Sequence, residues 1–568
     1  MMGVQLSSLT GEMPAGVGEA LEVVSGFDGA LVHGLARLGE EQAAALTSLA
    51  SAVAGTPLGS RALEAAEKIV AGSVADEHLV TLAGARSALL GAVHDALLDQ
   101  LDTSLARTRS SWEAVGSSPA VAQSTPDSAP VPTGDTGSAT QPGLGAQASS
   151  AAQASSGGQA SSSAQAGSGA QAGSGAQAGS GAQAGSGAQA GFGGRAGAAA
   201  WLREVAIAGW RGVDHDLVSA ADQTIEALLG DPGARRLAVL LDGLAAELRA
   251  SAPVATMAAI PERRWGDLWA RAVLLTHAPA GASVDASGGA SAGTSAGASL
   301  DASAGTSGGT SADASGGTSG GTSADASGGA FGGAFGGAFG DGEVVSGRLL
   351  VLGVDVHEHA TAVQMQVHGI LESGGRVVRA SVTAAKVDTI AGPAVWSLLG
   401  AYPVLLGALA GHLSIEIDGM ALLPGGDLVW DEAGAKAGEA ADPFATARVR
   451  LAEAAAPAVA PLERHPVRIA EPVLVEGYKV KDGVLHLDGH ELALDLDRLP
   501  AAGPLTPKLV TASTACIGLL RWDAGWRLQP LAVQGKSKAA HNGDLALQAA
   551  KGDAVAVLKE RAGRLLRR

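Results

Sequence analysis

Residues 479–494 read KVKDGVLHLDGHELAL, and this pattern sets the expected architecture of the C-terminal part of the chain. Two Asp-Gly pairs, at 482–483 and 488–489, separate short runs in which apolar and polar residues alternate. Asp-Gly between alternating runs is a strong signal for a β-hairpin, because both residues tolerate the positive φ of a tight turn. We therefore expect residues 343–568 to form an α+β domain with an antiparallel sheet.

Alternation of the same kind continues on both sides of this stretch. Residues 363–368 (VQMQVH) alternate between apolar and polar side chains, as a half-buried strand does. Residues 518–533 (GLLRWDAGWRLQPLAV) place an Asp-Ala-Gly turn between two tryptophans, which repeats the hairpin form. The C-terminal part is therefore expected to contain several antiparallel strands rather than one isolated hairpin.

The other folded parts of the chain show a helical period. Within residues 1–115, apolar residues recur every three or four positions, as in Leu90, Val93, Leu97, Leu101 and Leu105. Residues 197–280 resume this pattern, with a stop and a restart at the Gly-Asp-Pro of residues 230–232. We expect two all-α segments of the helical-bundle type. The sequence leaves open whether they form one bundle or two.

Two tracts are almost free of large apolar residues. Residues 116–196 contain four AQAGSG repeats, and residues 281–342 repeat TSADASGG. Such segments lack the apolar surface that would offset the loss of chain entropy on folding, so we expect disordered linkers. Flexible spacers of this length are expected to tether the folded segments rather than to fix them.

The chain has 568 residues and a net charge of −18, and each folded section is acidic. Phosphate neutralisation needs clustered lysine and arginine, so this balance argues against a nucleic-acid partner. The first 24 residues lack a basic region followed by an apolar run, which argues against a secretory signal. A single cysteine, Cys516, excludes an internal disulfide. We therefore expect a cytoplasmic protein, and the excess of arginine over lysine suggests a high-GC bacterium.

One uncharged stretch is long enough to span a bilayer. Residues 389–415 (TIAGPAVWSLLGAYPVLLGALAGHLSI) contain no charged residue. Pro393 and Pro403 interrupt a helix there, and the flanks show no excess of positive charge on one side. We expect a buried helix or helix pair and no membrane span.

The strongest candidate for chemistry lies in residues 347–363 (GRLLVLGVDVHEHATAV). On a strand, Asp355, His357 and His359 occupy alternate positions, so all three side chains project from one face. A carboxylate and two imidazoles are a ligand set suited to zinc or another divalent metal. Further ligands would come from His368, His412, His486 or His490, four of the other histidines in residues 343–568.

The motif VDVHEH resembles the first metal-binding motif of the amidohydrolase superfamily, an Asp followed by His-x-His at the end of the first barrel strand. The resemblance implies a (β/α)₈ barrel in which His357 and His359 bind metal. The match covers six residues, and no later histidine, lysine or aspartate motif of that superfamily follows it. Only 209 residues follow His359, and the Asp-Gly turns among them indicate hairpins rather than alternating strands and helices.

Two further features suggest contacts with another protein. Trp265 and Trp269 lie one helical turn apart in PERRWGDLWARAVLLT, where they form either a docking stripe or part of a helical core. Residues 553–568 form a predicted helix with cations crowded at its end, namely Arg561, Arg564, Arg567 and Arg568. Those cations either dock on an acidic partner or complement the negative end of the helix dipole.

Two functions follow from these patterns. The modular organisation favours a non-catalytic scaffold or adaptor that mediates protein–protein interactions without a cofactor, because flexible spacers make a second contact intramolecular. The strand motif favours a metal-dependent hydrolase with zinc or another divalent metal at Asp355, His357 and His359. No second motif supports catalysis, so the scaffold is the first hypothesis and the hydrolase is the alternative.

Overall fold

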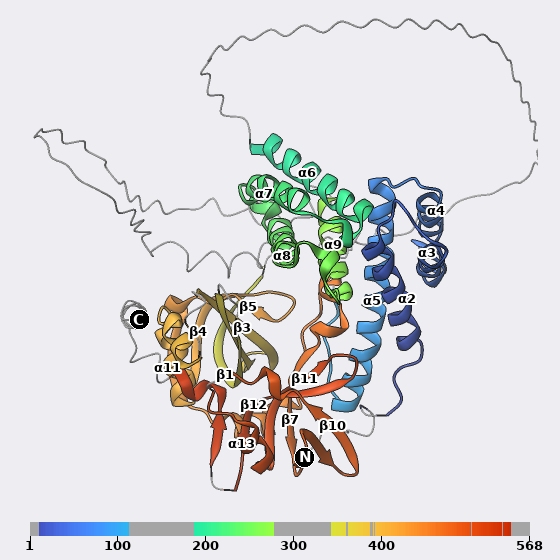
Figure 1. The fold of residues 1–568 in the computed structure, drawn as a ribbon. Coiled ribbons are helices and arrows are strands. Elements are labelled where there is room, and N and C mark those ends of the chain that lie inside the picture. The colour runs from blue at the N-terminus through green and yellow to red at the C-terminus, as the bar shows by residue number, and fades with distance from the viewer. Residues whose placement is uncertain are drawn as a thin grey trace, which may run out of the picture. The chain divides into compact units, whose positions relative to one another are not determined.

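The computed structural model describes residues 9, 11–112, 187–277, 342–358, 362–386, 390, 392–500, 503–536 and 538–546. Of the linkers expected at 116–196 and 281–342, residues 116–186 and 281–341 lie outside the described residues, as does the helix expected at 553–568. The described residues form an all-α part and a C-terminal α+β part with mainly antiparallel sheets (Figure 1), as the sequence predicts.

The all-α part is one bundle. Its helices are α2 (Val17–His33), α3 (Glu40–Ala52), α4 (Gly59–Val70), α5 (Asp76–Leu105), α6 (Gly187–Ala208), α7 (His215–Leu229), α8 (Arg235–Ser251) and α9 (Glu262–Thr276). The helices before and after the first tract share a single apolar core, which contains Phe27, Leu82 and Trp269. The two helical segments therefore form one bundle, which resolves the alternative that the sequence leaves open.

Helix α6 begins at Gly187, inside the tract that composition assigns to a linker. Small residues explain the difference, because they let α6 lie close against α7. A Cβ atom at Gly194 would lie 3.1 Å from Leu228 Cδ2, and one at Gly197 would lie 3.1 Å from Thr224 Oγ1. Both glycines therefore belong to a packing surface, and Gly194 corrects the linker expected at 116–196.

The first half of the α+β part is a small closed barrel. Its elements are β1 (Glu343–Glu358), β2 (Ala362–Leu371), β3 (Arg376–Ala385), α11 (Pro403–Gly411), β4 (Leu413–Leu422), β5 (Asp427–Leu428) and β6 (Ala435–Ala440). The first half of β1 pairs with β4 and the second half pairs with β2, while the short β5 bridges β3 and β4. These pairings close a ring in the order β1-β2-β3-β5-β4, in which only β3 and β5 are parallel, and β6 adds to β4.

The second half of the α+β part repeats this arrangement. Its elements are β7 (Ala470–Glu476), β8 (Lys479–Lys481), β9 (Val484–Leu487), β10 (His490–Leu494), α13 (Pro507–Ala512), β11 (Ala515–Trp522), β12 (Trp526–Gln534) and β13 (Ala539–His541). The consecutive strands β7 and β8 together take the place of β1, because β7 pairs with β11 and β8 pairs with β9. Strand β9 pairs with β10, β10 runs parallel to β12, and β12 pairs with β11.

Both halves have the strand order and connectivity of the OB-fold, a five-stranded Greek-key barrel, with α11 or α13 between the third and fourth strands. Asp482 and Asp488 adopt φ values of 51° and 50°, and each precedes a glycine with positive φ. This geometry confirms the two predicted Asp-Gly turns. The duplication itself was not predicted, because it depends on which strands pair and not on a repeated motif.

The uncharged stretch at residues 389–415 contains a short 3-10 helix (Gly392–Leu399) followed by α11. Leu405, Leu406 and Leu409 of α11 are buried in the core of the first barrel. The predicted buried helix is therefore confirmed. Among the helices of the described ranges, none is long and apolar enough to cross a membrane.

Helix α5 joins the bundle to the barrels. Its 30 residues span about 45 Å, and its first half packs in the bundle core through Leu79 and Leu82. Its second half packs on the second barrel, where Leu97 and Leu101 share a core with Val473. Figure 1 shows this helix running from the bundle to the strands of the second barrel. The bundle and the second barrel thus share an apolar interface, and the tethered arrangement expected from the tracts does not apply to them.

Candidate functional site

The predicted metal motif lies where the two barrels meet. Asp355 and His357 occupy alternate positions of β1 and project from the outside of the first barrel, as the strand period predicts. His357 Nε2 lies 2.8 Å from Asp355 Oδ2. Asp355 is 1% exposed, whereas the His357 side chain is 31% exposed. His359 lies outside the described residues.

The second barrel supplies the remaining partners of Asp355. Gln529 of β12 donates a hydrogen bond from Nε2 to Asp355 Oδ1 over 2.7 Å. Arg521 of β11 donates from a terminal guanidinium nitrogen to Asp355 Oδ2 over 2.8 Å, and its Nε donates to Gln529 Oε1 over 2.5 Å. His368 of β2 is buried and interacts electrostatically with Asp355. We call these five side chains the inter-barrel cluster: Asp355, His357, His368, Arg521 and Gln529.

Burial and charge fix the protonation of the inter-barrel cluster. Burial alone raises the pKa of Asp355, but the hydrogen bond from His357 and the charges of His357 and Arg521 outweigh it and hold the pKa well below its usual range. Burial lowers the pKa of His368 to about 4, so this imidazole is neutral at pH 7. Its Nε2 has no hydrogen-bond partner among the described residues. The cluster therefore holds a carboxylate that stays ionised rather than a general acid.

The described part of the predicted metal motif contacts the second barrel. Both oxygens of Asp355 accept hydrogen bonds from side chains of that barrel, and His359 lies outside the described residues. Within the described ranges, no group of three histidine, cysteine, aspartate or glutamate side chains is arranged to hold a metal. The other candidate ligands lie apart from Asp355, at the end of α11 (His412) and on β9 and β10 (His486 and His490).

The strand directions overturn the fold implied by the amidohydrolase resemblance. Strand β1 pairs antiparallel with both of its neighbours, whereas a (β/α)₈ barrel is built of parallel strands. The motif instead lies on the first strand of a five-stranded barrel. The expectation that His357 and His359 bind metal therefore loses the basis that the resemblance gave it.

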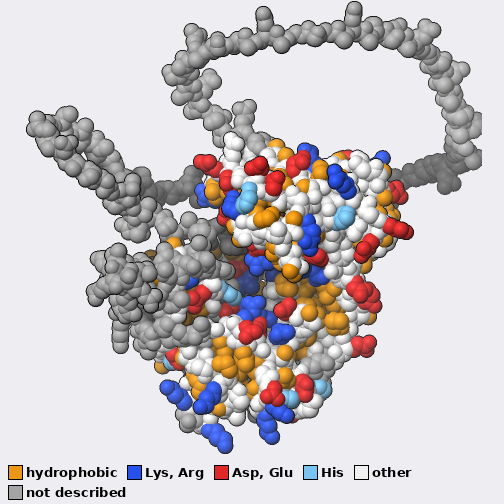
Figure 2. Space-filling model, in the orientation of Figure 1, with side chains coloured by type: hydrophobic (Ala, Val, Ile, Leu, Met, Phe, Trp, Pro, Cys, Tyr) orange, Lys and Arg blue, Asp and Glu red, His pale blue; other side chains and the backbone are white. Residues whose placement is uncertain are grey.

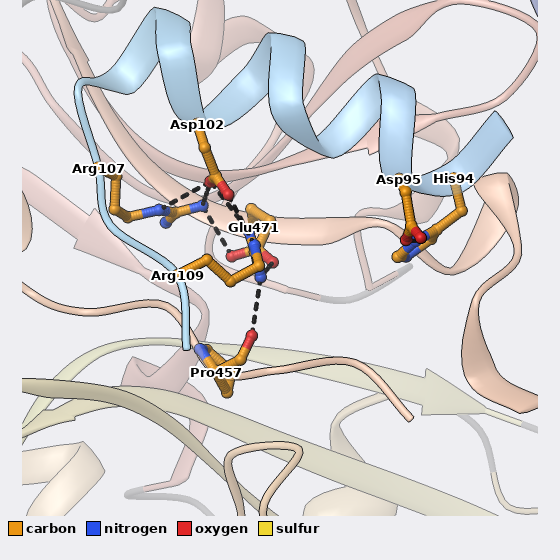
Figure 3. Close-up of polar contacts among 7 residues, drawn as sticks. All are labelled: His94, Asp95, Asp102, Arg107, Arg109, Pro457 and Glu471. Atoms are coloured by element: carbon orange, nitrogen blue, oxygen red, sulfur yellow. Dashed lines mark hydrogen bonds and ion pairs between the residues drawn. The ribbon is translucent and has the colours of Figure 1, made fainter. Parts of the chain in front are cut away.

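A second polar cluster joins the bundle to the barrels (Figure 3). Glu471 of β7 accepts hydrogen bonds from Arg107 and Arg109, each over 3.0 Å. Asp102, in the last turn of α5, accepts hydrogen bonds from the same two arginines. Arg109 also donates to the carbonyl of Pro457 over 3.0 Å. We call the four side chains the α5 clamp: Asp102, Arg107, Arg109 and Glu471.

The α5 clamp balances two cations with two carboxylates in a largely buried setting. Burial alone raises the pKa of Glu471, but Arg107 and Arg109 outweigh it and lower that pKa. The backbone adds two hydrogen bonds next to the clamp, from the Ala456 amide to the Thr108 carbonyl (2.9 Å) and from the Ser110 amide to the Ala456 carbonyl (3.0 Å). The clamp therefore fixes the chain that follows α5 against the barrels.

A third cluster gathers three arginines on one carboxylate, and we call it the Glu463 hub. Glu463 lies in the connection between the two barrels and accepts hydrogen bonds from Arg236 of α8, Arg271 of α9 and Arg468. The contact with Arg271 spans 2.7 Å. Figure 2 shows basic and acidic side chains together where the bundle faces the barrels. Through these ion pairs, the Glu463 hub links helices α8 and α9 of the bundle to the connection between the barrels.

Two hollows among the described residues are small. One, beside His412 and His541, has a volume of about 20 Å³. The other, beside Asp267, Arg271 and His465, has a volume of about 10 Å³. A cavity of this size holds about one water molecule, whereas a small-molecule site usually occupies about 300–1,000 Å³. Neither hollow accommodates a substrate in this conformation.

Trp265 and Trp269 lie in the bundle core and are 1% and 0% exposed. The Trp265 ring lies edge-on to Trp210, with ring centroids 5.5 Å apart, and Trp269 Nε1 donates to the Leu202 carbonyl over 3.0 Å. A docking stripe needs an exposed face, so we assign both tryptophans to core packing. The other predicted partner contacts lie outside the described residues: Arg561, Arg564, Arg567 and Arg568.

Sequence reasoning missed the α5 clamp and the Glu463 hub. Arg107 and Glu471 are 364 residues apart, and periodicity relates only neighbours in the chain. One signal was available, because residues 461–472 (PLERHPVRIAEP) gather two glutamates and two arginines between prolines, and these are the central glutamates of both clusters.

Comparisons with protein-family models, curated proteins and solved structures give no match. Strand connectivity alone does not specify a function. The function is therefore argued from the described geometry.

Proposed function

We propose that this protein is a non-catalytic scaffold or adaptor that mediates protein–protein interactions in the cytoplasm. In this proposal the bundle and the two barrels form a folded platform. The two low-complexity tracts are segments that the platform displays to partner proteins. No cofactor takes part.

The observation that carries the proposal is the anchoring of both tracts on the platform. The described chain stops at residue 112, next to the α5 clamp, and resumes in α6 of the same bundle. It stops again after α9 at residue 277 and resumes at residue 342, before β1. Each tract is therefore attached at both ends to a folded body that a shared core and buried ion pairs hold together. Such an arrangement suits display, since a partner bound to one tract is kept near the other.

The metal-dependent hydrolase gains no support from the described site. The carboxylate of Asp355 accepts hydrogen bonds from Arg521 and Gln529 of the second barrel, and within the described ranges no group of three possible ligands is arranged to hold a metal. Its burial also separates it from solvent and substrate. We therefore carry only the scaffold forward.

Deleting one tract in the full-length protein tests the proposal. Residues 116–186 are replaced by a Gly-Ser segment of about 20 residues, and copurifying proteins are compared with those of the wild type. We expect the thermal midpoint to be retained, since loop length changes stability only weakly, and the set of bound proteins to be lost. The matched control is a variant in which residues 116–186 keep their number and composition but are scrambled in order. It separates the effect of the tract's sequence from the effect of its length.

Two outcomes would overturn the scaffold. One is an unchanged set of bound proteins after deletion of either tract. The other is near-stoichiometric metal in the full-length protein that is lost in the His357→Ala/His359→Ala variant together with a metal-dependent activity. The second outcome would restore the hydrolase.

A further inference from the structure

The lysines of this chain are distributed unevenly. Five of the ten lie in the second barrel, and all five are exposed: Lys479, Lys481, Lys508, Lys536 and Lys538. Among the described residues, none of these five ammonium groups has an ion-pair or hydrogen-bond partner. Most arginines of the described ranges are instead paired with carboxylates, as in the α5 clamp and the Glu463 hub. The protein thus uses arginine for internal contacts and leaves these lysines available.

Packing brings the five lysines to one end of the second barrel, which we call the lysine end. Lys479 and Lys481 alternate on β8 and so project from the same face. Helix α13, which carries Lys508, packs against both β8 and β12. The turn after β12, which carries Lys536 and Lys538, also lies against α13, because a Cβ atom at Gly535 would be 3.8 Å from the Ala512 carbonyl oxygen. Figure 2 shows Lys and Arg side chains projecting along the lower edge of the barrels.

A complementary surface lies on the bundle. Helices α2, α3 and α4 pack on one another in chain order. Their exposed carboxylates form what we call the acidic helix face: Glu19, Glu22, Glu40, Glu41, Glu64 and Glu67. Within the described ranges these carboxylates have no ion-pair partner. Three exposed cations on the same part of the chain, Arg37, Arg61 and Lys68, offset only half of this charge.

We propose that the lysine end of one molecule docks on the acidic helix face of a second copy. The inference rests on the proposed scaffold function, since it names the protein itself as one of its partners. Two different surfaces meet in this contact, so in a pair one copy keeps a free lysine end and the other keeps a free acidic helix face. Association of this kind continues from copy to copy, or closes into a ring if the rotation between copies allows it.

Two copies attract each other only where the lysine end meets the acidic helix face, because their net charges repel. A net charge of −18 makes two copies repel at long range, but this repulsion is screened beyond about 10 Å at 0.1 M salt. Opposite charges that meet directly are within that distance and also steer the two copies into one orientation. Lysine suits an exposed contact of this type, because its flexible, hydrated ammonium group adapts to several carboxylates. The contact is therefore expected to be salt-sensitive.

Sedimentation velocity of the full-length protein tests the inference. At 0.1 M NaCl we expect larger species that grow with protein concentration, and at 0.5 M NaCl we expect the monomer. The Lys481→Glu/Lys508→Glu variant should associate at least about tenfold more weakly. Arg235→Glu/Lys436→Glu is the matched control, since it makes the same charge change at exposed positions of α8 and β6, and it should associate as the wild type does.

A mixture of two variants makes the test specific. Glu40→Lys/Glu41→Lys alone should also associate at least about tenfold more weakly than the wild type. A mixture of this variant with Lys481→Glu/Lys508→Glu should form pairs again, because one variant keeps the native lysine end and the other keeps the native acidic helix face. A monomeric wild type at 0.1 M NaCl, an unaffected lysine variant or a mixture that stays monomeric would each overturn the inference. Binding of the lysine end to DNA or to anionic vesicles without self-association would overturn it as well. Tract-dependent capture of other proteins would still hold in these cases, so the scaffold can survive the failure of this contact.

Discussion

Asp355 shows what one buried carboxylate does between the two barrels. Asparagine at this position leaves the largely buried Arg521 without its counter-charge. We expect Asp355→Asn to lower the free energy of unfolding by about 3–5 kcal/mol, because an unpaired charge remains in a low-dielectric setting. Urea denaturation of the full-length protein measures this change.

Glu343→Gln is the matched control for that variant. Glu343, on β1, also pairs with an arginine, Arg376 of β3, but the Glu343 side chain is 62% exposed. Exposed ion pairs contribute little, so we expect a loss of less than about 1 kcal/mol. Equal losses in the two variants would contradict a role for the inter-barrel cluster in holding the barrels together.

Three buried histidines make stability depend on pH. Burial lowers the pKa of His368, His465 and His541 to about 4, whereas an unfolded histidine titrates near 6.5. The unfolded chain therefore binds more protons below pH 6.5, so the contribution of each residue is complete above that pH and is lost as the pH falls toward 4. Each contributes up to about 3 kcal/mol.

Urea denaturation at pH 7, 6 and 5 measures this dependence. His368→Gln should reduce the fall in stability between pH 6.5 and 4, because the titrating group is gone. His486→Gln is the control, since the His486 side chain is 38% exposed. A pH dependence that His368→Gln leaves unchanged would contradict the burial argument.

At the scale of elements, one glycine lets β1 lie close to the second barrel. A Cβ atom at Gly353 would lie 2.8 Å from Leu531 Cβ. Gly353→Val should therefore push the strands apart and lower stability by about 1–3 kcal/mol, as thermal unfolding would show. Gly243→Ala in α8 is the control, because a Cβ there meets no atom within 4 Å and alanine favours the helix. A stable Gly353→Val variant would contradict the close approach.

Turns and helices could be predicted where neighbouring residues in the sequence specify them. The contacts between distant strands could not be predicted in this way. The Asp-Gly turns, the uncharged helix and the placement of Asp355 beside His357 all follow from residues a few positions apart. The partner of Asp355 lies 166 residues later, on a strand of another barrel. Periodicity places a side chain on a face but does not say what covers that face. This is why the sequence motif did not reveal the contact that Asp355 makes with the second barrel.

At the scale of the whole molecule, the second barrel depends on α5. Residues 343–568 alone would expose the apolar surface that Leu97, Leu98 and Leu101 cover in the full chain. We expect this fragment to bind the dye ANS and to aggregate, and the full-length protein to do neither.

A peptide of residues 88–112 supplied in trans should reduce dye binding by the fragment. The same peptide with Leu97→Asp/Leu101→Asp is the matched control and should have no effect, because its apolar stripe is interrupted. A fragment that binds no dye would show that the shared core is dispensable.

The continuous α5 also has a consequence for synthesis. Helix α5 emerges from the ribosome early in translation. The strands that cover its second half are synthesised more than 350 residues later. At roughly 5–20 residues per second, the apolar stripe of the nascent helix waits tens of seconds for its partner. A chaperone that shields nascent chains would bind within that interval, and the yield of native protein would rise or fall with the rate of translation.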